Sequence, residues 1–403
     1  MKNEIAIPWS KVAVLGAAGK MGKGIALLLL CEMAFVPSSI LMLQDLKQSA
    51  FYDLRRYLRE HLLKHLEKNI EAVRAFYADR QDLVSNKEMI DTLLQDAIDR
   101  VFCTRSIADL NGASMVFEAI IEDVNEKLQI LKDVFDVTKG QAYFFTNTSS
   151  IPIGFLQRES TIGNRLIGYH FYNPPAVQKL LEIIIPKGTD PTLCSLAFHL
   201  AKVWKKTVVE SEDVAGFIGN GHFIREIAFA CHMAMELCKE MPLEKAVKLI
   251  NCVTKEALVR PMGIFELIRY VGIDVCCHIA KVMSRFLPSE AHLFDAMVKN
   301  LKIIGQVDLT VVDRASCDLN WKSASKMVQE ERNEKLKLHF SSLKGQEAAI
   351  AQQFLEQSLQ IAKGLVDSKV AKALSDVSLV LMHGFYHLYG VAEFSLKERI
   401  GNA

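Results

Sequence analysis

The chain has 403 residues, of which 50% are hydrophobic and 24% charged, and its formal net charge is +1. This length exceeds one ordinary hydrophobic core, so we expect two or three globular domains. A net charge so close to zero offers no electrostatic footprint for nucleic acid or an anionic membrane. The longest apolar run, Ile25 to Cys31, is far too short to span a bilayer. These features exclude nucleic acid and membrane as expected partners.

The nine cysteines are odd in number and scattered, and no two have the C-x-x-C spacing. This pattern argues against a disulfide framework and a zinc site, and it favours a reducing compartment. Met1 to Ser10 carries charges of both signs and a proline, unlike a signal or transit peptide. We therefore expect a cytoplasmic protein that holds no metal.

A nucleotide-binding pattern begins near the N-terminus. Residues 11–15 read as a buried parallel strand, a glycine turn over 16–22 opens a helix at 25–33, and a strand at 40–43 precedes Asp45. Glycines let the backbone approach a pyrophosphate at the helix N-terminus, and the acid binds ribose hydroxyls and disfavours NADP. The turn has one residue more than G-x-G-x-x-G, and a turn that only packs a helix on a sheet is the alternative. The predicted cofactor is NAD, held by Gly16, Gly19, Lys20, Met21, Gly22 and Asp45.

The next segments extend the same domain. Residues 50–100 are charged with a helical period, so we predict a projecting helical hairpin. Strands at 115–120 and 142–146 lead to further polar residues. Ligands of open α/β sheets bind at the carboxyl ends of strands. We therefore expect the nicotinamide side of the site to include Glu122, Lys127 and Ser149.

The stretch from Asn147 to Asn173 combines a hydroxyl, an imidazole and several amides. Asn147-Thr148-Ser149-Ser150 is followed by His170-Phe171-Tyr172-Asn173-Pro174, and a strand at 180–184 carries Glu182. A histidine with a pKa near neutrality can move a substrate proton, although a lone histidine between aromatics is more often a core residue. Residues 213–220 then close the α/β part and open a long helical tail.

At this point the chain resembles the L-3-hydroxyacyl-CoA dehydrogenases over about Lys11 to Asp274. Motifs agree in type, order and spacing: the glycine turn, F-E-A-I-I-E-D, N-T-S-S, H-F-Y-N-P-P, L-L-E-I, D-V-A-G-F-I-G-N and P-M-G-I-F-E-L-I-R-Y-V-G-I-D. The resemblance implies an α/β Rossmann-type domain over 1–212, with the hairpin at about 50–100 inserted. An all-α region of the 6-phosphogluconate dehydrogenase C-terminal-like type would follow it.

Carried over by position, the resemblance implies that His170, Glu182, Ser149 and Asn220 are catalytic. His170 would take the proton of the 3-hydroxyl as hydride leaves C3 for NAD⁺. Glu182 would orient the ring and stabilise the imidazolium, while Ser149 and Asn220 would donate to substrate oxygens. Taken singly, Ser149 could cap a helix, Glu182 could lie on a surface strand and Asn220 in a turn. The expected cofactor contacts also include Glu122, Lys127, Asn147 and Asn173.

Three departures from the family put substrate fit and rate in doubt. The glycine turn is altered, Gly221 follows Asn220 where the family usually has Arg, and Ala215 stands where Pro is common. The hairpin is also longer than usual, and in the family it contacts the CoA moiety.

Residues 237–265 and 361–388 are similar to each other. Each reads as helix, short turn, helix and a segment with glycine beside an aromatic residue. This resembles the duplicated C-terminal domain of the multifunctional fatty-acid oxidation proteins, with chance similarity between amphipathic helices as the alternative. We predict a first helical copy over 213–325 and a degraded second copy over 326–403. Because single-copy relatives dimerise through this domain, the second copy predicts a monomeric pseudo-dimer, with a homodimer as the alternative.

The resemblance implies NAD-dependent oxidation of an L-3-hydroxyacyl-CoA to the 3-oxoacyl-CoA in fatty-acid β-oxidation, or the reverse reduction in short-chain acyl-CoA synthesis. One alternative is a dehydrogenase of a free 3-hydroxy acid. Another is a weakly active subunit that binds NAD or acyl-CoA in a β-oxidation complex. Gly221 and the altered turn motivate the subunit, whereas His170 and Glu182 argue against it. A hydratase or thiolase partner is left open, because no segment is recognisable as either.

Overall fold

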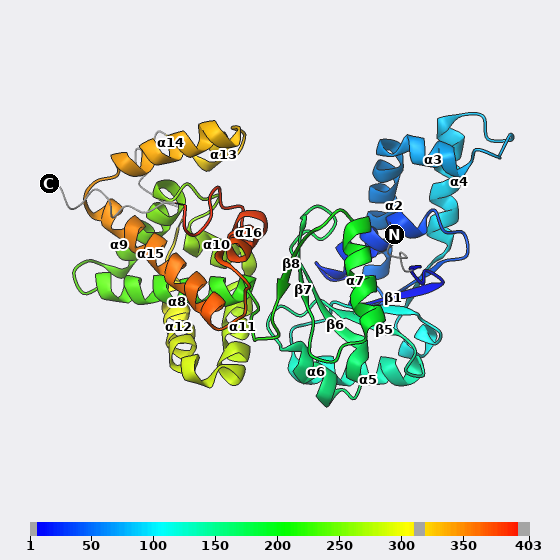
Figure 1. Cartoon of the computed structure of the whole chain (residues 1–403), viewed down its shortest axis with the longest axis horizontal. Coiled ribbons are helices and arrows are strands. Elements are labelled where there is room, and N and C mark those ends of the chain that lie inside the picture. Colours follow the sequence, from blue (N-terminus) through cyan, green and yellow to red (C-terminus); the bar gives the residue numbers. More distant parts are fainter. Residues whose placement is uncertain (1–5, 310–318, 394–403) are drawn as a thin grey trace. The chain divides into compact units, whose positions relative to one another are not determined.

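The computed structural model describes residues 6–309 and 319–393, and the chain divides into two compact units. Unit 1 comprises Met1–Thr148 and Ile153–Val208, and it contains seven strands of the sheet and the start of the eighth. Unit 2 comprises Ser149–Pro152 and Val209–Ala403, and it is helical (Figure 1). An α/β Rossmann-type region followed by an all-α region is therefore confirmed.

Eight strands form one sheet in the order β3-β2-β1-β4-β5-β6-β7-β8. Parallel pairing joins β1 to β2 and β4, and it extends through β3, β5 and β6. The chain crosses from β3 back to β4 beside β1, which creates the switch point where such sheets bind nucleotides. β7 runs antiparallel to β6. The bounds are β1 Lys11–Leu15, β2 Ile40–Gln44, β3 Val101–Thr104, β4 Met115–Glu118, β5 Tyr143–Thr146, β6 Leu166–Phe171, β7 Leu180–Ile184 and β8 Thr207–Ser211.

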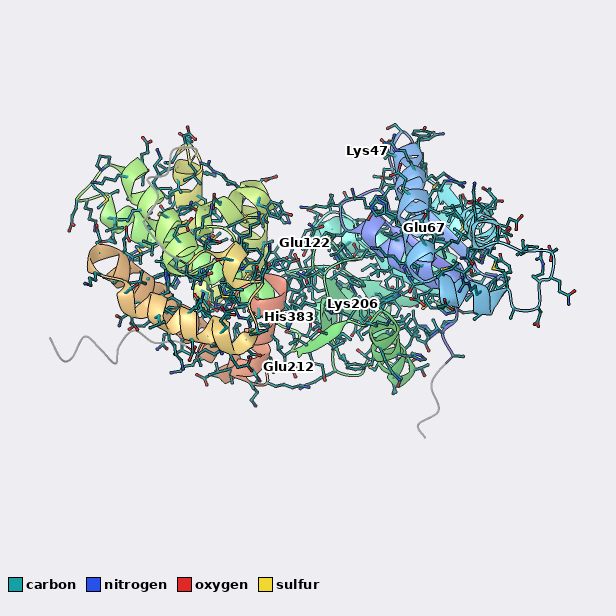
Figure 2. All side chains as sticks on the ribbon, turned by 90° about the horizontal axis from the view of Figure 1, so that it is seen from above. Lys47, Glu67, Glu122, Lys206, Glu212 and His383 are labelled. Atoms are coloured by element: carbon teal, nitrogen blue, oxygen red, sulfur yellow. The ribbon has the colours of Figure 1, made fainter. Side chains whose placement is uncertain are left out.

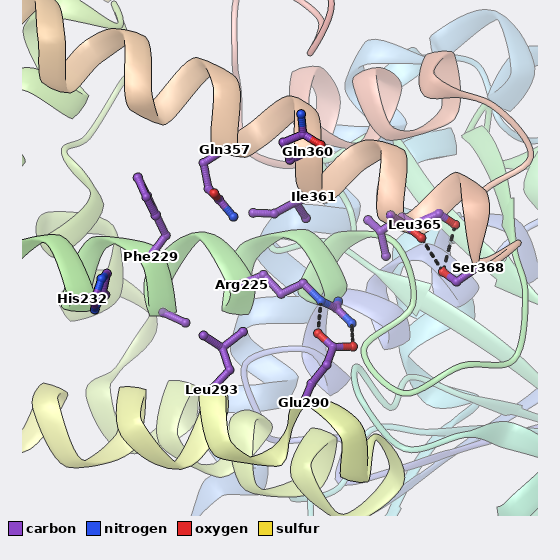
Figure 3. A pocket seen from close by; sticks show the side chains of 12 residues that line it. Arg225, Phe229, His232, Glu290, Leu293, Gln357, Gln360, Ile361, Leu365 and Ser368 are labelled. Carbon is purple, nitrogen blue, oxygen red and sulfur yellow. Dashed lines mark hydrogen bonds and ion pairs between the residues drawn. The ribbon is translucent and has the colours of Figure 1, made fainter.

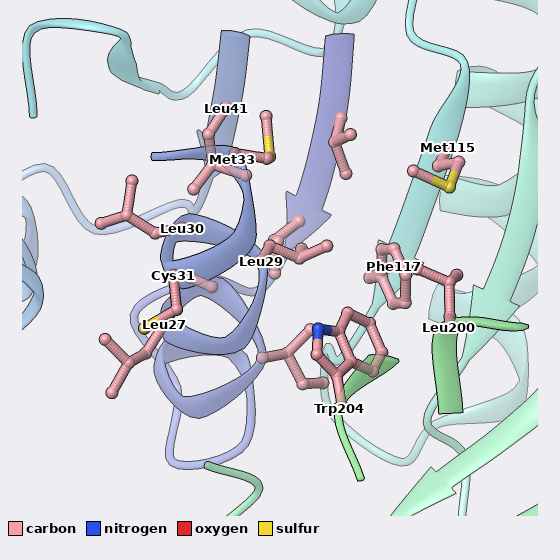
Figure 4. Packing of buried hydrophobic residues seen from close by; sticks show 14 of the residues in the cluster. Leu27, Leu29, Leu30, Cys31, Met33, Leu41, Met115, Phe117, Leu200 and Trp204 are labelled. Carbon is pink, nitrogen blue, oxygen red and sulfur yellow. The ribbon is translucent and has the colours of Figure 1, made fainter. Parts of the chain in front are cut away.

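The core of unit 1 fixes the helix that follows the glycine turn. Helix α1 buries Leu27, Leu29 and Leu30, and Phe117 of β4 and Trp204 belong to the same cluster (Figure 4). Burying each large apolar side chain stabilises the fold by about 1.5–3 kcal/mol. The N-terminus of α1 is thereby held firmly at the switch point. The helices of this unit are α1 Gly22–Met33, α2 Ala50–Lys68, α3 Ile70–Phe76, α4 Asn86–Asp99, η1 Ile107–Leu110, α5 Val124–Val137, α6 Ile153–Glu159, η2 Gly163–Arg165 and α7 Pro191–Val203.

The predicted hairpin is present as α2, α3 and α4, and it extends away from the sheet (Figure 1). Its α2 helix buries a leucine at every fourth position from Leu54 to Leu66, as an amphipathic helix does. Ser85 caps α4 and forms a capping box with Glu88. Within the hairpin, Arg56 forms an ion pair with the exposed Asp53. The Arg56 side chain therefore has a structural partner.

Unit 2 is built around α8, against which α9, α12 and α15 pack. The contact with α15 includes a buried bond between His222 Nε2 and Ser358 Oγ at 2.9 Å. In the described residues, no helix combines the length and apolar composition that crossing a membrane requires. The elements are α8 Gly219–Leu237, α9 Leu243–Cys252, η3 Val253–Ala257, α10 Ile264–Val271, α11 Ile273–Phe286, η4 Pro288–Glu290, α12 Ala291–Ile304, α13 Trp321–Ala324, α14 Gln329–Ser342, α15 Gly345–Asp367 and α16 Leu374–Gly384.

The two segments compared as repeats share the order helix, turn, helix but differ in register. Residues 245–247 lie within α9, whereas residues 369–371 lie in the turn before α16. The N–H of Glu212 donates to Val370 O at 3.0 Å, and Lys372 pairs with Glu210 at 2.8 Å. These contacts hold residues 369–371 as a turn. Duplication stays a prediction.

Candidate active site

The glycine turn has no room for side chains at two positions. Gly16 has φ +69°, and a Cβ there would lie 2.7 Å from Ala119 O. A Cβ on Gly22 would lie 2.1 Å from Gly16 O. The extra residue is absorbed by a tight turn in which Gly19 N donates to Gly16 O at 3.0 Å. The turn therefore brings bare backbone to the N-terminus of α1, which suits a pyrophosphate.

Asp45, the expected ribose acid, lies against this turn. Its Oδ2 accepts from Ala18 N at 3.0 Å and its Oδ1 from Lys47 N at 3.2 Å. The carboxylate thus joins the end of β2 to the glycine turn, as a dinucleotide site requires. The neighbouring Lys20 is exposed.

Lys127 lies inside a buried cluster of charged groups. Its Nζ is 2.6 Å from Glu118 Oε1 and 3.5 Å from Glu122 Oε2, and its side chain is 1% exposed. Burial alone would lower the pKa of Lys127, but the charges of both carboxylates and their hydrogen bonds raise it above its ordinary value. Glu122, which is labelled in Figure 2, also accepts from Thr148 Oγ1 at 2.7 Å. Lys127 therefore fixes Glu122 at the carboxyl end of β4.

Asn147 follows β5 and contacts the ends of β4 and β6, the strands on either side of it. Its Oδ1 accepts from Phe171 N at 2.8 Å, and its own N–H donates to Glu118 O at 2.8 Å. Asn173 follows two residues later and is joined to Pro174 by a cis peptide bond. The amides expected near the cofactor thus follow β5 and β6, on the carboxyl side of both strands.

His170 and Glu182 form a pair across two antiparallel strands. They are directly opposite each other in the register of β6 and β7, where facing side chains are close neighbours. His170 Nδ1 lies 2.7 Å from Glu182 Oε2. Glu182 is fully buried and His170 is 7% exposed. The carboxylate is therefore not on a surface strand, and its hydrogen bonds fix the imidazole ring.

Ser149 and Asn220 come together in unit 2. Asn220 lies in the first turn of α8, and its Nδ2 donates to Ser149 O at 2.9 Å. Gly216 N donates to Ser150 O at 3.1 Å, so the segment after β5 is held by the start of the helical unit. This explains why Ser149–Pro152 group with unit 2. The His170–Glu182 pair belongs to unit 1.

The structure gives a local reason for Gly221. A Cβ at this position would lie 3.3 Å from Leu365 Cδ2, and Gly221 O accepts from Arg225 Nη1 at 2.7 Å. Arg225 also makes a bidentate pair with Glu290 at 2.6 and 2.7 Å (Figure 3). The residue that replaces the family's arginine thus lies where α15 packs closely on α8.

The fold and these residues define a Rossmann-type dehydrogenase class, and comparison with known proteins identifies the family. The model of the 3-hydroxyacyl-CoA dehydrogenase NAD-binding domain matches residues 11–214, and the model of its C-terminal domain matches residues 216–305. The chain belongs to the 3-hydroxyacyl-CoA dehydrogenase family. Its cofactor is NAD, and its reaction is oxidation of a 3-hydroxyacyl-CoA.

Relatives agree with this assignment. The chain is 27% identical over 278 residues to a probable 3-hydroxybutyryl-CoA dehydrogenase of Bacillus subtilis, covering 68% of this chain and 85% of the relative. It is 28% identical over 273 residues to the 3-hydroxybutyryl-CoA dehydrogenase of Bradyrhizobium diazoefficiens, with coverages of 68% and 83%. The crystal structure of 3-hydroxybutyryl-CoA dehydrogenase from Escherichia coli has a TM-score of 0.66 at 19% identity, covering 96% of this chain and 91% of that one. That last likeness shows the fold.

Three side chains in these contacts were not predicted. Glu118 is fully buried and holds Lys127, Thr148 donates to Glu122, and the Tyr172 hydroxyl donates to Glu182 at 2.8 Å. The sequence does contain a signal for Glu118. A glutamate at the end of an apolar strand predicts a buried partner of opposite charge, because an unpaired buried charge is costly. The other two contacts have no signal in the sequence.

Proposed function

We propose that this chain oxidises an L-3-hydroxyacyl-CoA with His170 as the base and Glu182 as its partner. The observation that carries the proposal is the 2.7 Å contact between His170 Nδ1 and a fully buried Glu182 carboxylate. A carboxylate only accepts, so the hydrogen of a neutral imidazole lies on Nδ1. Nε2 then carries the lone pair, so it is the ring nitrogen that can accept a proton.

The proton and the hydride leave the substrate along separate routes. His170 Nε2 takes the proton of the 3-hydroxyl, the C3–O bond becomes a carbonyl, and NAD⁺ when bound supplies the acceptor for the C3 hydride. The resulting imidazolium lies against the Glu182 carboxylate, away from bulk water, where opposite charges attract more strongly. Proton transfer of this kind contributes roughly 10²–10⁴-fold to rate.

Ser149 and Asn220 are the proposed donors to the substrate oxygens. The Asn220 amide nitrogen carries two hydrogens, of which one serves Ser149 O. This bond joins the Asn220 side chain to the Ser149 backbone and so keeps the two residues together, which favours their acting on one group. Loss of a donor of this kind typically costs about 3–4 kcal/mol in the barrier.

NAD fits the residues of unit 1 that would hold it. Gly16, Gly19, Lys20, Met21 and Gly22 would receive the pyrophosphate, because a Cβ at Gly16 or Gly22 would block the backbone. Asp45 would bind the ribose hydroxyls, and its charge opposes the 2′-phosphate of NADP. On the nicotinamide side the proposed contacts are Glu122, held by Lys127, together with Asn147 and Asn173.

The same proposal extends to assembly and location. Helix α15 packs on α8, the helix after the glycine-phenylalanine-isoleucine segment, and this supports a monomer in which a second copy covers that face. The odd number and scattered spacing of the cysteines support a cytoplasmic location. A separate hydratase would supply the 3-hydroxyacyl-CoA, and a separate thiolase would consume the 3-oxoacyl-CoA product.

Steady-state kinetics with several substrates test this proposal. We expect NADH formation from 3-hydroxyacyl-CoA and much less turnover of the free 3-hydroxy acid, with NAD preferred over NADP. Glu182→Gln should lower kcat by about 10²-fold or more, because it removes the charge beside the imidazolium. Exposed Glu159 offers a control in Glu159→Gln, for which wild-type rates are expected. Equal rates in Glu182→Gln and wild type would contradict the proposal.

A further inference from the structure

A second hydroxyl group contacts the buried carboxylate of Glu182. The Tyr172 hydroxyl donates to Glu182 Oε2 at 2.8 Å, and this oxygen also faces Nδ1 of His170 at 2.7 Å. Side chains two residues apart in extended chain project to the same side, and the rings of His170 and Tyr172 have centroids 4.9 Å apart. One carboxylate oxygen therefore serves both rings.

The Tyr172 hydroxyl keeps its proton and so remains a hydrogen-bond donor. Burial, then the charge of Glu182 and the bond to it, raise the pKa of Tyr172 well above its ordinary value, so the phenol stays protonated in the neutral range. Glu182 is 0% exposed, so bulk water cannot replace a lost donor. A buried polar group without its partner is costly, and the bond is consequently stronger than on a surface.

We infer that Tyr172 is a positioning residue for His170, acting through the Glu182 carboxylate, an inference that rests on the proposed function. The hydroxyl holds the carboxylate in the orientation that faces Nδ1 and takes a share of the charge on Oε2. A donor to a carboxylate stabilises its ionised form and weakens its pull on a second proton. Loss of the Tyr172 hydroxyl would therefore leave more of the carboxylate charge directed at His170.

Glu182 on β7 and Tyr172 after β6 are titratable groups that contact His170. Two other charged groups of unit 1 have partners of their own. Lys206, just before β8, donates to two backbone carbonyls of the loop after β6. Glu122, after β4, lies 3.5 Å from Lys127. A change at Tyr172 therefore acts on His170 through the carboxylate that they share.

The test compares two tyrosine-to-phenylalanine variants of the full chain. Tyr172→Phe removes the donor and keeps the ring. Tyr143→Phe is the matched control, because the Tyr143 hydroxyl also donates to a carboxylate, Asp190 Oδ2 at 3.2 Å, but at the start of β5. In Tyr172→Phe we expect the His170 pKa, measured by NMR titration, to rise by about half to one unit. The acid limb of kcat/KM for oxidation should move to higher pH by the same amount, with no change in Tyr143→Phe.

An unchanged His170 pKa in folded Tyr172→Phe would overturn the inference. His170→Gln separates it from the proposed function: wild-type turnover in that variant would refute the proposed base itself. An inactive His170→Gln with an unchanged pKa in Tyr172→Phe would refute the positioning role alone. If Tyr172→Phe does not fold, site-specific 3,5-difluorotyrosine at 172 keeps the ring and makes a stronger donor. The acid limb should then move to lower pH, and an unmoved limb would refute the role.

Discussion

Replacing Lys127 with methionine tests whether the buried cluster at the end of β4 supports the site. The change keeps most of the aliphatic volume but leaves Glu118, which is fully buried, without its cation at 2.6 Å. Removing one partner of a buried ion pair typically costs about 3–5 kcal/mol. Glu118 keeps donors in Ile120 N at 2.8 Å and Thr146 Oγ1 at 2.5 Å, so we expect the lower end, about 3 kcal/mol.

Guanidinium unfolding followed by tryptophan fluorescence measures this loss, because Trp9 and Trp204 both belong to unit 1. The double variant Lys127→Met with Glu118→Gln removes the buried charge and should recover at least half of the loss. Arg56→Met, which breaks an exposed pair in the same unit, should cost less than about 1 kcal/mol. A Lys127→Met variant as stable as Arg56→Met would refute the role assigned to the cluster.

Three further predictions concern the glycine at α8, the ribose acid and a half-buried lysine. Gly221→Arg forces a side chain against Leu365, so the melting temperature should fall with a loss of about 1–3 kcal/mol; an unchanged melting temperature would contradict the packing. Asp45→Ala should weaken NAD binding about tenfold and reduce the preference for NAD over NADP, as measured by fluorescence titration. Unchanged affinities for both cofactors would argue against a ribose contact. Burial lowers the pKa of Lys206 to about 8, below the value of about 10.4 in an unfolded chain. The unfolded state then binds more protons between these values, so wild type should gain stability over Lys206→Met as pH rises from about 8 to 10; a constant difference would refute the shift.

The sequence predicted β1, β2, β4, β5 and β7, because each is a short apolar run. It did not predict β3 or β8, which have mixed patterns. In β3 only Val101 is buried and Phe102 is 48% exposed. Such strands exist because a neighbouring strand offers hydrogen bonds, as β2 does for β3. The residue pattern within a segment does not indicate which strand will pair with it.

For the site, the individual residues followed from a family resemblance, and their contacts needed the structure. His170 and Glu182 are twelve residues apart, and only the antiparallel register of β6 and β7 makes them opposite. Tyr172 looks like one more aromatic residue until its hydroxyl is seen on Glu182. The grouping of Ser149 with the helical unit likewise depends on a hydrogen bond from Asn220, which lies 71 residues later in the sequence. The roles assigned to these residues stay predictions.

The most direct test of the central claim is single-turnover oxidation of a 3-hydroxyacyl-CoA by His170→Gln in the full chain, beside NAD titration of the same sample. We predict that the rate of NADH formation falls by about 10²–10⁴-fold while the NAD dissociation constant stays within about twofold of wild type. A wild-type rate at unchanged NAD affinity would show that His170 does not move the substrate proton.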